Sequence, residues 1–342
     1  MKLSVIIVNY NVKYFLEQCL NSVLASKINF DYETIIVDNN STDNSLEYLK
    51  PRFTQSNIYF IANKDNPGFS KANNQAIQQA KGEYILLLNP DTVLEENVLS
   101  DVCNFLDNHS DAGAAGVKTI DGTGKFLAES KRGFPTPWAS FCKLSGLESL
   151  FPKSKIFGKY SLKYLDENRL HKVPILVGSF MMIRKSVLDK IGLLDETFFM
   201  YGEDIDLSFR IIQAGYNNYY LPKKIIHYKG ESTDKSDPKY TQAFYDAMRI
   251  FFRKYYPNYS KFYSSFISAG ISLKAFFASL NKKRTQPFIN KDGQVIILST
   301  KENTYKEIID KIDNNTNKNI QFRIYNPDTG IEIGPRTIKQ IS

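Results

Sequence analysis

The sequence predicts an α/β fold with a mostly parallel sheet that helices cover on both faces. In the first third of the chain, strongly apolar segments of strand length alternate with segments whose apolar residues recur at helical spacing. Strands this apolar are buried on both faces, which is typical of parallel sheets in α/β proteins. The length of 342 residues is suited to about two domains.

Three strand–helix units and a fourth strand make up the first part of the predicted fold. Ser41 is the expected N-cap of the second helix, Pro51 ends that helix, and Gly82 ends the third. The predicted strands span 3–10, 32–40, 58–63 and 83–90, and the predicted helices span 12–26, 42–50 and 70–81.

The middle of the chain has a less regular pattern. Segments 114–120 and 126–130 predict strands on either side of a turn, and residues 131–170 are rich in loops. A strand followed by a helix is expected over 173–192, and a further strand over 214–230.

The C-terminal third begins with a helical pattern over 240–281, broken near Pro257. Residues 262–280 carry an apolar stripe at helical spacing, but Lys274 and the four serines before it interrupt the segment, so we expect an amphipathic helix rather than a membrane span. Residues 288–342 predict a small α/β tail, with strands at 294–300 and 320–325 around a helix near 302–313.

Positive charge is concentrated in one segment of the chain. The net charge is +8, and residues 223–284 alone contain 13 Lys and Arg but 4 Asp and Glu. A basic segment rich in Tyr and Phe indicates contact with an anionic membrane surface or with nucleic acid. No nucleic-acid motif is present, so no nucleic acid is expected as a partner. A homodimer interface explains the amphipathic helix about as well as a membrane surface does.

The cysteines and the N-terminus bear on the compartment. Cys19, Cys103 and Cys142 are odd in number and widely spaced, which fits neither a disulfide framework nor a zinc site and favours a reducing environment. The first residues predict a buried strand rather than a signal peptide. We therefore expect a cytoplasmic protein, with peripheral contact to the inner face of the cytoplasmic membrane as an option.

Polar residues stand at the end of each of the first four predicted strands. In an open parallel sheet, ligands bind at the carboxyl ends of the strands, although Asn, Asp and Gly also make ordinary turns. These strand ends are Tyr10-Asn11, Asp38-Asn39-Asn40-Ser41, Asn66-Pro67-Gly68-Phe69 and Asn89-Pro90-Asp91.

Three carboxylates crowd into four positions at Glu203, Asp204 and Asp206, between aromatic and aliphatic residues. Buried carboxylates need partners. This stretch is either an acidic first helical turn that complements the helix dipole or a site that holds a metal or moves a proton. Asp206 and Arg210 are four apart on a helix that starts here and can pair.

Five motifs in order, SVIIVNYN, IIVDNNSTD, NPGFSKANN, LLLNPDT and GEDIDLSFR, resemble the motif series of family-2 inverting glycosyltransferases with the GT-A fold. The pattern is most similar to rhamnosyltransferase-like and galactofuranosyltransferase-like enzymes. The resemblance covers about residues 1–230 and implies a catalytic domain there that binds a nucleotide-sugar. Residues 231–286 then form a basic, aromatic-rich helical segment, and 287–342 a small appendage of unassigned role.

The resemblance implies a nucleotide site along the first three strand ends and Asn89. Asp38 would bind the imide of a uracil or thymine ring, and Tyr10 would line the base pocket. Asn66, Gly68 and Asn73 would lie along the ribose and diphosphate. The residues carried over as nucleotide-binding are Tyr10, Asn11, Asp38, Asn40, Asn66, Gly68, Asn73 and Asn89.

The resemblance also implies a divalent metal, Mg²⁺ or Mn²⁺, on the diphosphate. Asp91 matches the last Asp of the family's DxD motif, whereas Asn89 stands in the first position and removes one anionic ligand. His227 matches the place of a further metal ligand in related enzymes. Oxygen ligands and phosphates suit either metal ion.

Inverting transfer needs one base for the acceptor hydroxyl, and the resemblance gives this role to Asp204. Glu203 would bind acceptor hydroxyls or support the base. Gly178 and Ser179 match the strand that borders the sugar and acceptor pocket.

The expected function is transfer of a sugar from dTDP-rhamnose or a UDP-hexose to a hydroxyl of a glycan or lipid-linked saccharide. Processive synthases of the family carry a Gln-x-x-Arg-Trp motif, and the only tryptophan here, Trp138, stands outside any such motif. Two alternatives stay open. One is a catalytically silent nucleotide-sugar-binding homologue, which Asn89 alone favours, and the other is a nucleic-acid binder that acts through 223–284.

Overall fold

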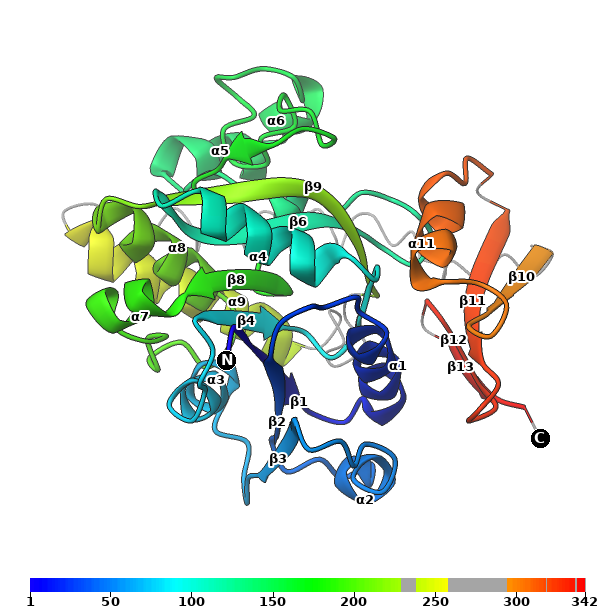
Figure 1. The fold of residues 1–342 in the computed structure, drawn as a ribbon. Coiled ribbons are helices and arrows are strands. Elements are labelled where there is room, and N and C mark those ends of the chain that lie inside the picture. Colours follow the sequence, from blue (N-terminus) through cyan, green and yellow to red (C-terminus); the bar gives the residue numbers. More distant parts are fainter. Residues whose placement is uncertain (229–237, 258–293, 318, 336, 342) are drawn as a thin grey trace.

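The computed structural model describes residues 1–228, 238–257, 294–317, 319–335 and 337–341. Over these residues the chain forms a nine-stranded sheet with helices on both faces and a separate four-stranded sheet near the C-terminus (Figure 1). The predicted α/β architecture with a small α/β tail is confirmed. The predicted amphipathic helix at 262–280 lies outside the described residues. Among the residues described, no helix is both long and apolar enough to cross a bilayer.

The elements of the large sheet and its helices follow the predicted alternation over the first third of the chain. The strands are β1 (Leu3–Asn9), β2 (Tyr32–Asp38), β3 (Ile58–Ala62), β4 (Tyr84–Leu88), β5 (Thr92–Leu94), β6 (Ala112–Ile120), β7 (His171–Lys172), β8 (Phe180–Arg184) and β9 (Asn217–His227). The helices are α1 (Lys13–Leu24), α2 (Ser45–Leu49), α3 (Phe69–Ile77), α4 (Val98–Asn108), α5 (Pro137–Leu144), α6 (Leu147–Leu150), α7 (Lys185–Ile191), α8 (Glu203–Gln213) and α9 (Pro238–Tyr255).

The strand order in the large sheet is β3-β2-β1-β4-β8-β6-β9-β5, and β7 pairs with β9. Strands β1 to β4 are parallel to one another, and β6 and β9 run in the same direction as they do. Strands β5, β7 and β8 run in the opposite direction. The sheet is therefore mostly parallel, as predicted, and the direction first reverses between β4 and β8.

Side chains along β1 alternate between two buried layers, because successive residues of a strand point to opposite faces. Val5 and Ile7 belong to the core that α1 and α4 cover. Ile6 and Val8 belong to the core that α3, α7 and α8 cover. Burial on both faces accounts for the nearly continuous apolar sequence of this strand.

Several predicted elements need correction. Ser41 does not cap α2, because its hydroxyl accepts hydrogen bonds from the side chain of Asn9 and the backbone of Asn11, and the helix begins at Ser45. Segment 126–130 is a single bridge and a short 3₁₀ helix rather than a strand. The loop-rich region 131–170 includes α5 and α6, and Trp138 lies on α5.

The tail consists of β10 (Gln294–Ser299), α11 (Tyr305–Asp313), β11 (Ile320–Asn326), β12 (Ile331–Gly334) and β13 (Thr337–Gln340). Its apolar side shares one buried cluster with Phe15 of α1, Val93 of β5 and Ile226 of β9. The Glu96 carboxylate accepts hydrogen bonds from the first two backbone N–H groups of α11, and Lys224 pairs with Asp310 and Asp313. The tail is therefore packed on the edge of the large sheet.

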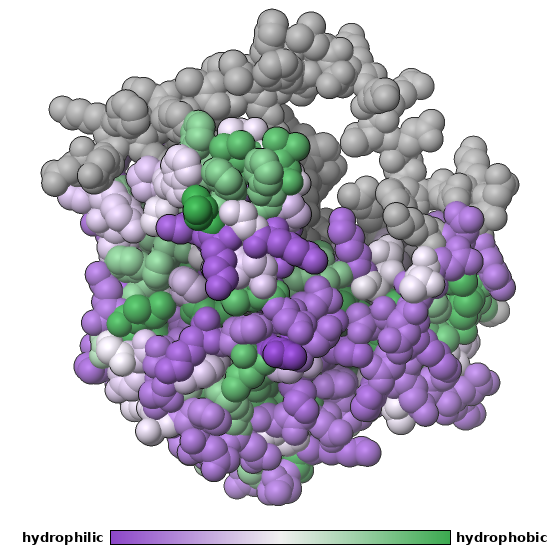
Figure 2. Space-filling model, turned by 90° about the horizontal axis from the view of Figure 1, so that it is seen from above, coloured by the Kyte–Doolittle hydropathy of each residue, from purple (hydrophilic) through white to green (hydrophobic). Residues whose placement is uncertain are grey.

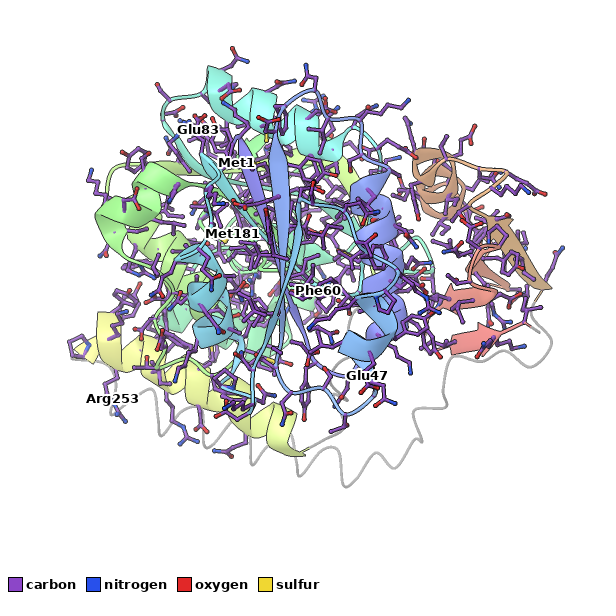
Figure 3. The ribbon with its side chains drawn as sticks, turned by 60° about the horizontal axis from the view of Figure 1, so that its bottom comes forward. Met1, Glu47, Phe60, Glu83, Met181 and Arg253 are labelled. Carbon is purple, nitrogen blue, oxygen red and sulfur yellow. The ribbon has the colours of Figure 1, made fainter. Side chains whose placement is uncertain are left out.

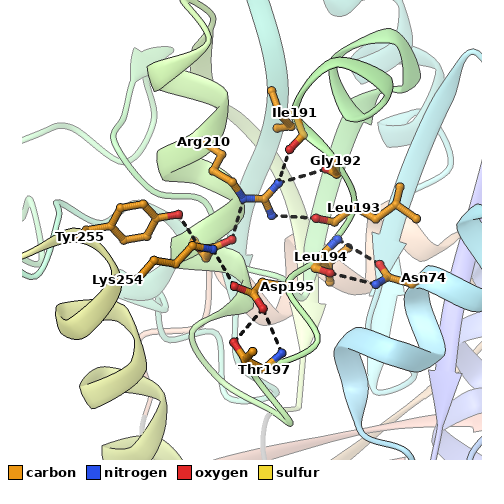
Figure 4. Close-up of polar contacts among 11 residues, drawn as sticks. Asn74, Ile191, Gly192, Leu193, Leu194, Asp195, Thr197, Arg210, Lys254 and Tyr255 are labelled. Atoms are coloured by element: carbon orange, nitrogen blue, oxygen red, sulfur yellow. Dashed lines mark hydrogen bonds and ion pairs between the residues drawn. The ribbon is translucent and has the colours of Figure 1, made fainter.

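Helix α9 packs on the opposite side of the large sheet from α1 and the tail (Figure 3). Asp206 of α8 is fully buried and anchors this contact. Its Oδ2 accepts a hydrogen bond from Arg210 Nε at 2.7 Å, so the predicted pair is confirmed. Its Oδ1 accepts from Lys254 Nζ at 2.7 Å and from Tyr255 Oη at 2.6 Å, both on α9 (Figure 4).

The other donors of Arg210 and Lys254 fix the loop that precedes α8. Arg210 donates to the carbonyls of residues 191–193, at the C-terminal end of α7, and Lys254 pairs with Asp195 at 2.6 Å. Asn74 of α3 holds the backbone of Leu194 through two hydrogen bonds (Figure 4). One buried carboxylate therefore joins α8 to α9 and, through its two cations, to the loop before α8.

Asp206→Asn should lower the free energy of unfolding by about 2–4 kcal/mol, because it removes the buried counter-charge of Arg210 and leaves Lys254 with Asp195 alone. Urea unfolding followed by fluorescence measures this change. The matched control is Asp246→Asn on α9, whose carboxylate makes an exposed pair with Arg249 and should contribute less than about 1 kcal/mol. Equal losses in the two variants would contradict the anchoring role of Asp206.

Candidate active site

The ends of β1 and β2 form one hydrogen-bonded unit. The parallel register places Asn9 opposite Asp38, and Asn9 Nδ2 donates to Asp38 Oδ1 at 2.7 Å. The backbone N–H of Ser41 donates to Asp38 Oδ2 at 2.9 Å. Asp38 is thus buried and held as an acceptor at the end of its strand. Asn9 was not among the predicted site residues, although a polar residue at the end of an apolar strand is a usable signal.

Residues in the left-handed backbone conformation shape the two loops that follow these strands. Asn11 and Asn40 have φ values of 58° and 60°, which Asn adopts more readily than most residues. Asn11 Oδ1 accepts a hydrogen bond from the backbone N–H of Thr42 at 2.7 Å. Tyr10, the residue before Asn11, is exposed. These predicted nucleotide-binding residues therefore lie on two loops that bind each other.

The loop before α3 is joined to the same unit through Asn39. Asn39 Nδ2 donates to Asn66 Oδ1 at 3.2 Å and to the carbonyl of Gly68 at 3.3 Å. The backbone N–H of Gly68 also donates to Asn66 Oδ1. Asn73, by contrast, is buried in α3 and donates to the carbonyl of Phe69. Asn39 was missed as a functional position, because its contacts depend on the fold.

Gly68 is required where this loop meets the segment before α8. Its φ is +92°, and a Cβ atom there would lie 2.7 Å from both the ring and the carbonyl oxygen of Phe199. The next residue, Phe69, donates its backbone N–H to the same carbonyl at 2.7 Å. The prediction explained this glycine by close approach to phosphate, whereas its observed neighbour is Phe199. This contact links the expected nucleotide side to the segment before α8, the helix that carries the expected base.

The residues predicted to hold a metal lie together. Strand β5 pairs antiparallel with β9 so that Thr92 is opposite His227, and His227 Nε2 lies 3.2 Å from Asp91 Oδ1. Asn89 Nδ2 lies 3.4 Å from the same imidazole nitrogen. Among the described residues no group of three or more His, Cys, Asp or Glu side chains gathers in a way that could hold a metal ion.

This donor set fits Mg²⁺ or Mn²⁺ in the presence of a diphosphate. One carboxylate, one imidazole and waters leave positions for phosphate oxygens, and magnesium sites often use one or two carboxylates plus substrate phosphates. The turn at residues 89–91, which carries Asp91, is fixed by Thr92 Oγ1, which donates a hydrogen bond to the carbonyl of Asn89 at 2.8 Å. Cys19 packs beneath it, and burial raises the pKa of this thiol to about 12, so Cys19 is a packing residue.

Asp204 lies at the start of α8, and one of its carboxylate oxygens accepts hydrogen bonds. Arg132 Nη2 lies 2.5 Å from Asp204 Oδ2, and the backbone N–H of Gly178 donates to the same oxygen at 3.3 Å. No hydrogen bond to Oδ1 comes from the part of the chain that the structure describes. A Cβ atom at Gly178 would lie 3.7 Å from the Cβ of Asp204, which is ordinary van der Waals contact.

Glu203, the neighbouring acid, lies in a different environment. Burial, and then the negative charge of Asp204, raise the pKa of the Glu203 carboxyl above its ordinary range. Its Oε2 and the Ser179 hydroxyl are buried with no hydrogen-bond partner among the described residues. Buried polar atoms without partners are rare in folded proteins, so both are candidates for contact with a bound hydroxyl.

Strand β8 joins the two halves of the site. Leu88 pairs with Phe180, and the backbone N–H of Asn89 donates to the carbonyl of Ser179 at 3.1 Å. The expected metal residues and the expected base residues therefore meet at Gly178 and Ser179. Arg132 was not predicted, because nothing in the pattern of the loop-rich segment singles it out.

The match to a known family covers the strand ends and the turn at 89–91, and it ends before α8 and His227. The family model described as Glycosyl transferase family 2 matches residues 4–192, which is more than half of the chain. The N-acetylglucosaminyl-diphospho-decaprenol L-rhamnosyltransferase of Mycobacterium tuberculosis is 26% identical over 261 residues, covering 73% of this chain and 83% of that protein.

Two solved structures share the fold. One is Staphylococcus aureus TarS in complex with UDP-GlcNAc, with a TM-score of 0.50 and 20% identity over 73% of this chain. The other is GalNAc-T7 with UDP, GalNAc and Mn²⁺, with a TM-score of 0.53 and 18% identity over 74% of this chain. The chain spans 65% and 50% of those two chains, which is less than two thirds of each.

Glu203→Gln should make the free energy of unfolding less dependent on pH. Above its ordinary value of 4.5, Glu203 keeps a proton in the folded state that the unfolded chain releases. Its contribution to stability is therefore present at low pH and falls as pH rises toward the raised pKa, and the neutral amide avoids that loss. Urea unfolding at about pH 5 and about pH 8 measures the difference.

The stability of the Gln variant relative to wild type should increase between those two pH values. Glu302→Gln, which changes an exposed carboxyl, is the matched control and should show no such trend. A Glu203→Gln profile parallel to wild type would contradict the raised pKa.

Proposed function

The chain belongs to glycosyl transferase family 2 and is a glycosyltransferase, and from this premise we propose that it is an inverting, non-processive enzyme. It moves a sugar from a nucleotide-diphosphate sugar, dTDP-rhamnose or a UDP-hexose, to a hydroxyl of a glycan or lipid-linked saccharide. The observation that carries this proposal is the Asp204 carboxylate, which has one oxygen held by Arg132 and Gly178 and the other unengaged by described residues. We assign the catalytic role to residues 1–230. We also propose that the enzyme is located in the cytoplasm.

In the proposed reaction, Asp204 Oδ1 takes the proton of the acceptor hydroxyl. The acceptor oxygen forms its bond to the anomeric carbon from the face opposite the leaving group. The bond from that carbon to the diphosphate oxygen breaks, and its electron pair leaves with the nucleotide diphosphate. Attack and departure on opposite faces invert the configuration at the anomeric carbon. Arg132 orients the carboxylate through its ion pair with Oδ2.

The donor assignment rests on the first two strand ends. Asp38 is buried and anchored by Asn9, and its oxygens are suited to accept a hydrogen bond from the imide of uracil or thymine. The similarity to a rhamnosyltransferase and to a protein solved with UDP-GlcNAc supports the two donor classes. Tyr10, with its exposed ring beside this unit, is assigned to the base.

Asp91 and His227 would hold the divalent metal, and the bound metal would neutralise the charge that develops on the diphosphate. The structural neighbour GalNAc-T7, solved with Mn²⁺, supports this assignment. Gly178, Ser179 and Glu203 are assigned to the acceptor and sugar side. The raised pKa of Glu203 favours its protonated form, which can donate a hydrogen bond to a sugar oxygen.

A thermal-shift panel with UDP, dTDP, GDP and CMP, each with and without Mn²⁺, tests the donor assignment. A nucleotide at about 100 times its dissociation constant adds about 2.7 kcal/mol of stability, enough for a shift of several degrees. A Mn²⁺-dependent shift with UDP or dTDP is expected. No shift with any nucleotide would overturn the donor site, and a shift without turnover would favour the silent homologue.

Asp204→Asn should reduce turnover by about 10²–10⁴, the usual contribution of a general base. Donor binding should stay unchanged, because Asp204 lies on the acceptor side of Ser179. The measurement is a transfer assay together with the thermal shift for the donor nucleotide. Wild-type turnover in this variant would remove Asp204 from the mechanism.

Asp91→Ala should weaken nucleotide binding only in the presence of Mn²⁺, because it removes the carboxylate that lies 3.2 Å from His227. Titration calorimetry with UDP or dTDP, with and without Mn²⁺, measures this difference. Asp121→Ala, which removes a carboxylate from an exposed turn, is the control. Equal Mn²⁺ dependence in Asp91→Ala and wild type would contradict the metal assignment.

A further inference from the structure

The arm formed by residues 137–163 carries large apolar side chains on the outside of the protein. It contains α5 and α6 and projects beyond β6 and β9 at the top of Figure 1. The exposed fractions are 45% for Trp138, 72% for Leu150, 52% for Phe151 and 59% for Ile156. Single exposed apolar residues are ordinary, whereas four within 19 positions form a patch that needs an explanation. Seen from above, hydrophobic residues gather on this face with hydrophilic residues bordering them (Figure 2).

Contacts inside the arm hold these side chains in one group. Trp138 Nε1 donates to the carbonyl of Ile156 at 3.1 Å. The ring centroid of Phe157 lies 6.3 Å from that of Trp138 and 5.4 Å from that of Phe151. Thr136 caps α5 through its hydroxyl, and Pro137 occupies the first helical turn. The patch is therefore a feature of a packed arm, in which Trp138 and Phe151 both lie against Phe157.

Positive charge surrounds the patch. Residues 137–163 contain five lysines and one acidic residue, Glu148, which is buried. Lys143 lies 3.7 Å from that carboxylate. The other four lysines are exposed and form no ion pair within the described parts of the chain; they are Lys153, Lys155, Lys159 and Lys163.

We propose that this arm docks the enzyme on an anionic bilayer. Aliphatic and aromatic side chains beside unpaired lysines are suited to the boundary between acyl chains and anionic headgroups. A second copy of this chain is a poorer occupant, because a self-complementary contact would bring the same positive charges together. The arm differs from the basic segment 223–284, for which the sequence left membrane contact and a homodimer interface as alternatives.

The arm is also connected to the catalytic carboxylate. The backbone N–H of Gly133 donates to the carbonyl of Tyr160 within the arm at 2.7 Å, and Arg132 beside it pairs with Asp204. Docking through the arm would therefore bring the acceptor side of the site to the membrane surface. This consequence rests on the proposed function, because only a lipid-linked acceptor makes that position useful to the enzyme.

Vesicle flotation with the full chain tests the proposal. Vesicles of phosphatidylcholine alone are compared with vesicles that contain phosphatidylglycerol as well. Wild-type protein should float with the anionic vesicles, and Leu150→Ser/Phe151→Ser/Ile156→Ser should reduce the partition coefficient by about tenfold or more. Lys153→Ala/Lys155→Ala should reduce the preference for anionic over neutral vesicles.

The matched control is Val295→Ser/Ile297→Ser, which removes exposed apolar side chains of β10 and should float like wild type. A triple variant that floats like wild type, or a wild-type protein that binds neither kind of vesicle, would overturn the proposal. Melting temperature and the nucleotide-induced shift are measured on every variant. If the protein binds vesicles through the arm but no nucleotide shifts its melting temperature, the docking proposal is supported and the proposed transferase function is refuted.

Discussion

The reversal of strand direction between β4 and β8 is the constraint on which the site depends. Strand β4 pairs in parallel with β1 on one side and antiparallel with β8 on the other, and Leu88 lies opposite Phe180. After three intervening residues the chain pairs again, with Thr92 opposite His227. The turn at 89–91 is held between these two registers. A slip of one residue in either pairing would turn Asp91 or His227 to the other face of the sheet.

Two carboxylates that are two positions apart in the acidic stretch have different roles because of helical geometry. Residues i and i+2 of a helix point in widely different directions, so Asp204 and Asp206 do not share partners. Asp206 is fully buried and all its observed contacts are structural. Asp204 is bound through a single oxygen. The stretch thus contains both an anchor for the helix and a candidate reactive group. The sequence alone had left a structural helix start and a chemical site as alternatives.

The strand ends could be predicted because their signal is local. A buried strand is recognisable from a few consecutive apolar residues, and the carboxyl ends of parallel strands meet at one edge. Asn9, Asn39 and Arg132 were missed because their contacts come from segments distant in sequence. Ser41 was misassigned for a similar reason: its hydroxyl has the chemistry of a helix cap, but Asn9 and Asn11 donate to it across the strand ends. Local propensity predicted the helices and strands, whereas tertiary contacts determined the hydrogen-bond partners of the polar side chains.

The packing of the tail on the sheet edge affects where the chain can be divided. Phe15, Val93 and Ile226 belong to the same apolar cluster as Ile308 and Phe322 of the tail. A chain shortened after residue 286 would uncover those three side chains on strands and a helix next to His227. Such a fragment would expose an apolar surface to solvent and be prone to self-association. The tail is best regarded as part of the folding unit of the catalytic domain, in spite of its separate sheet.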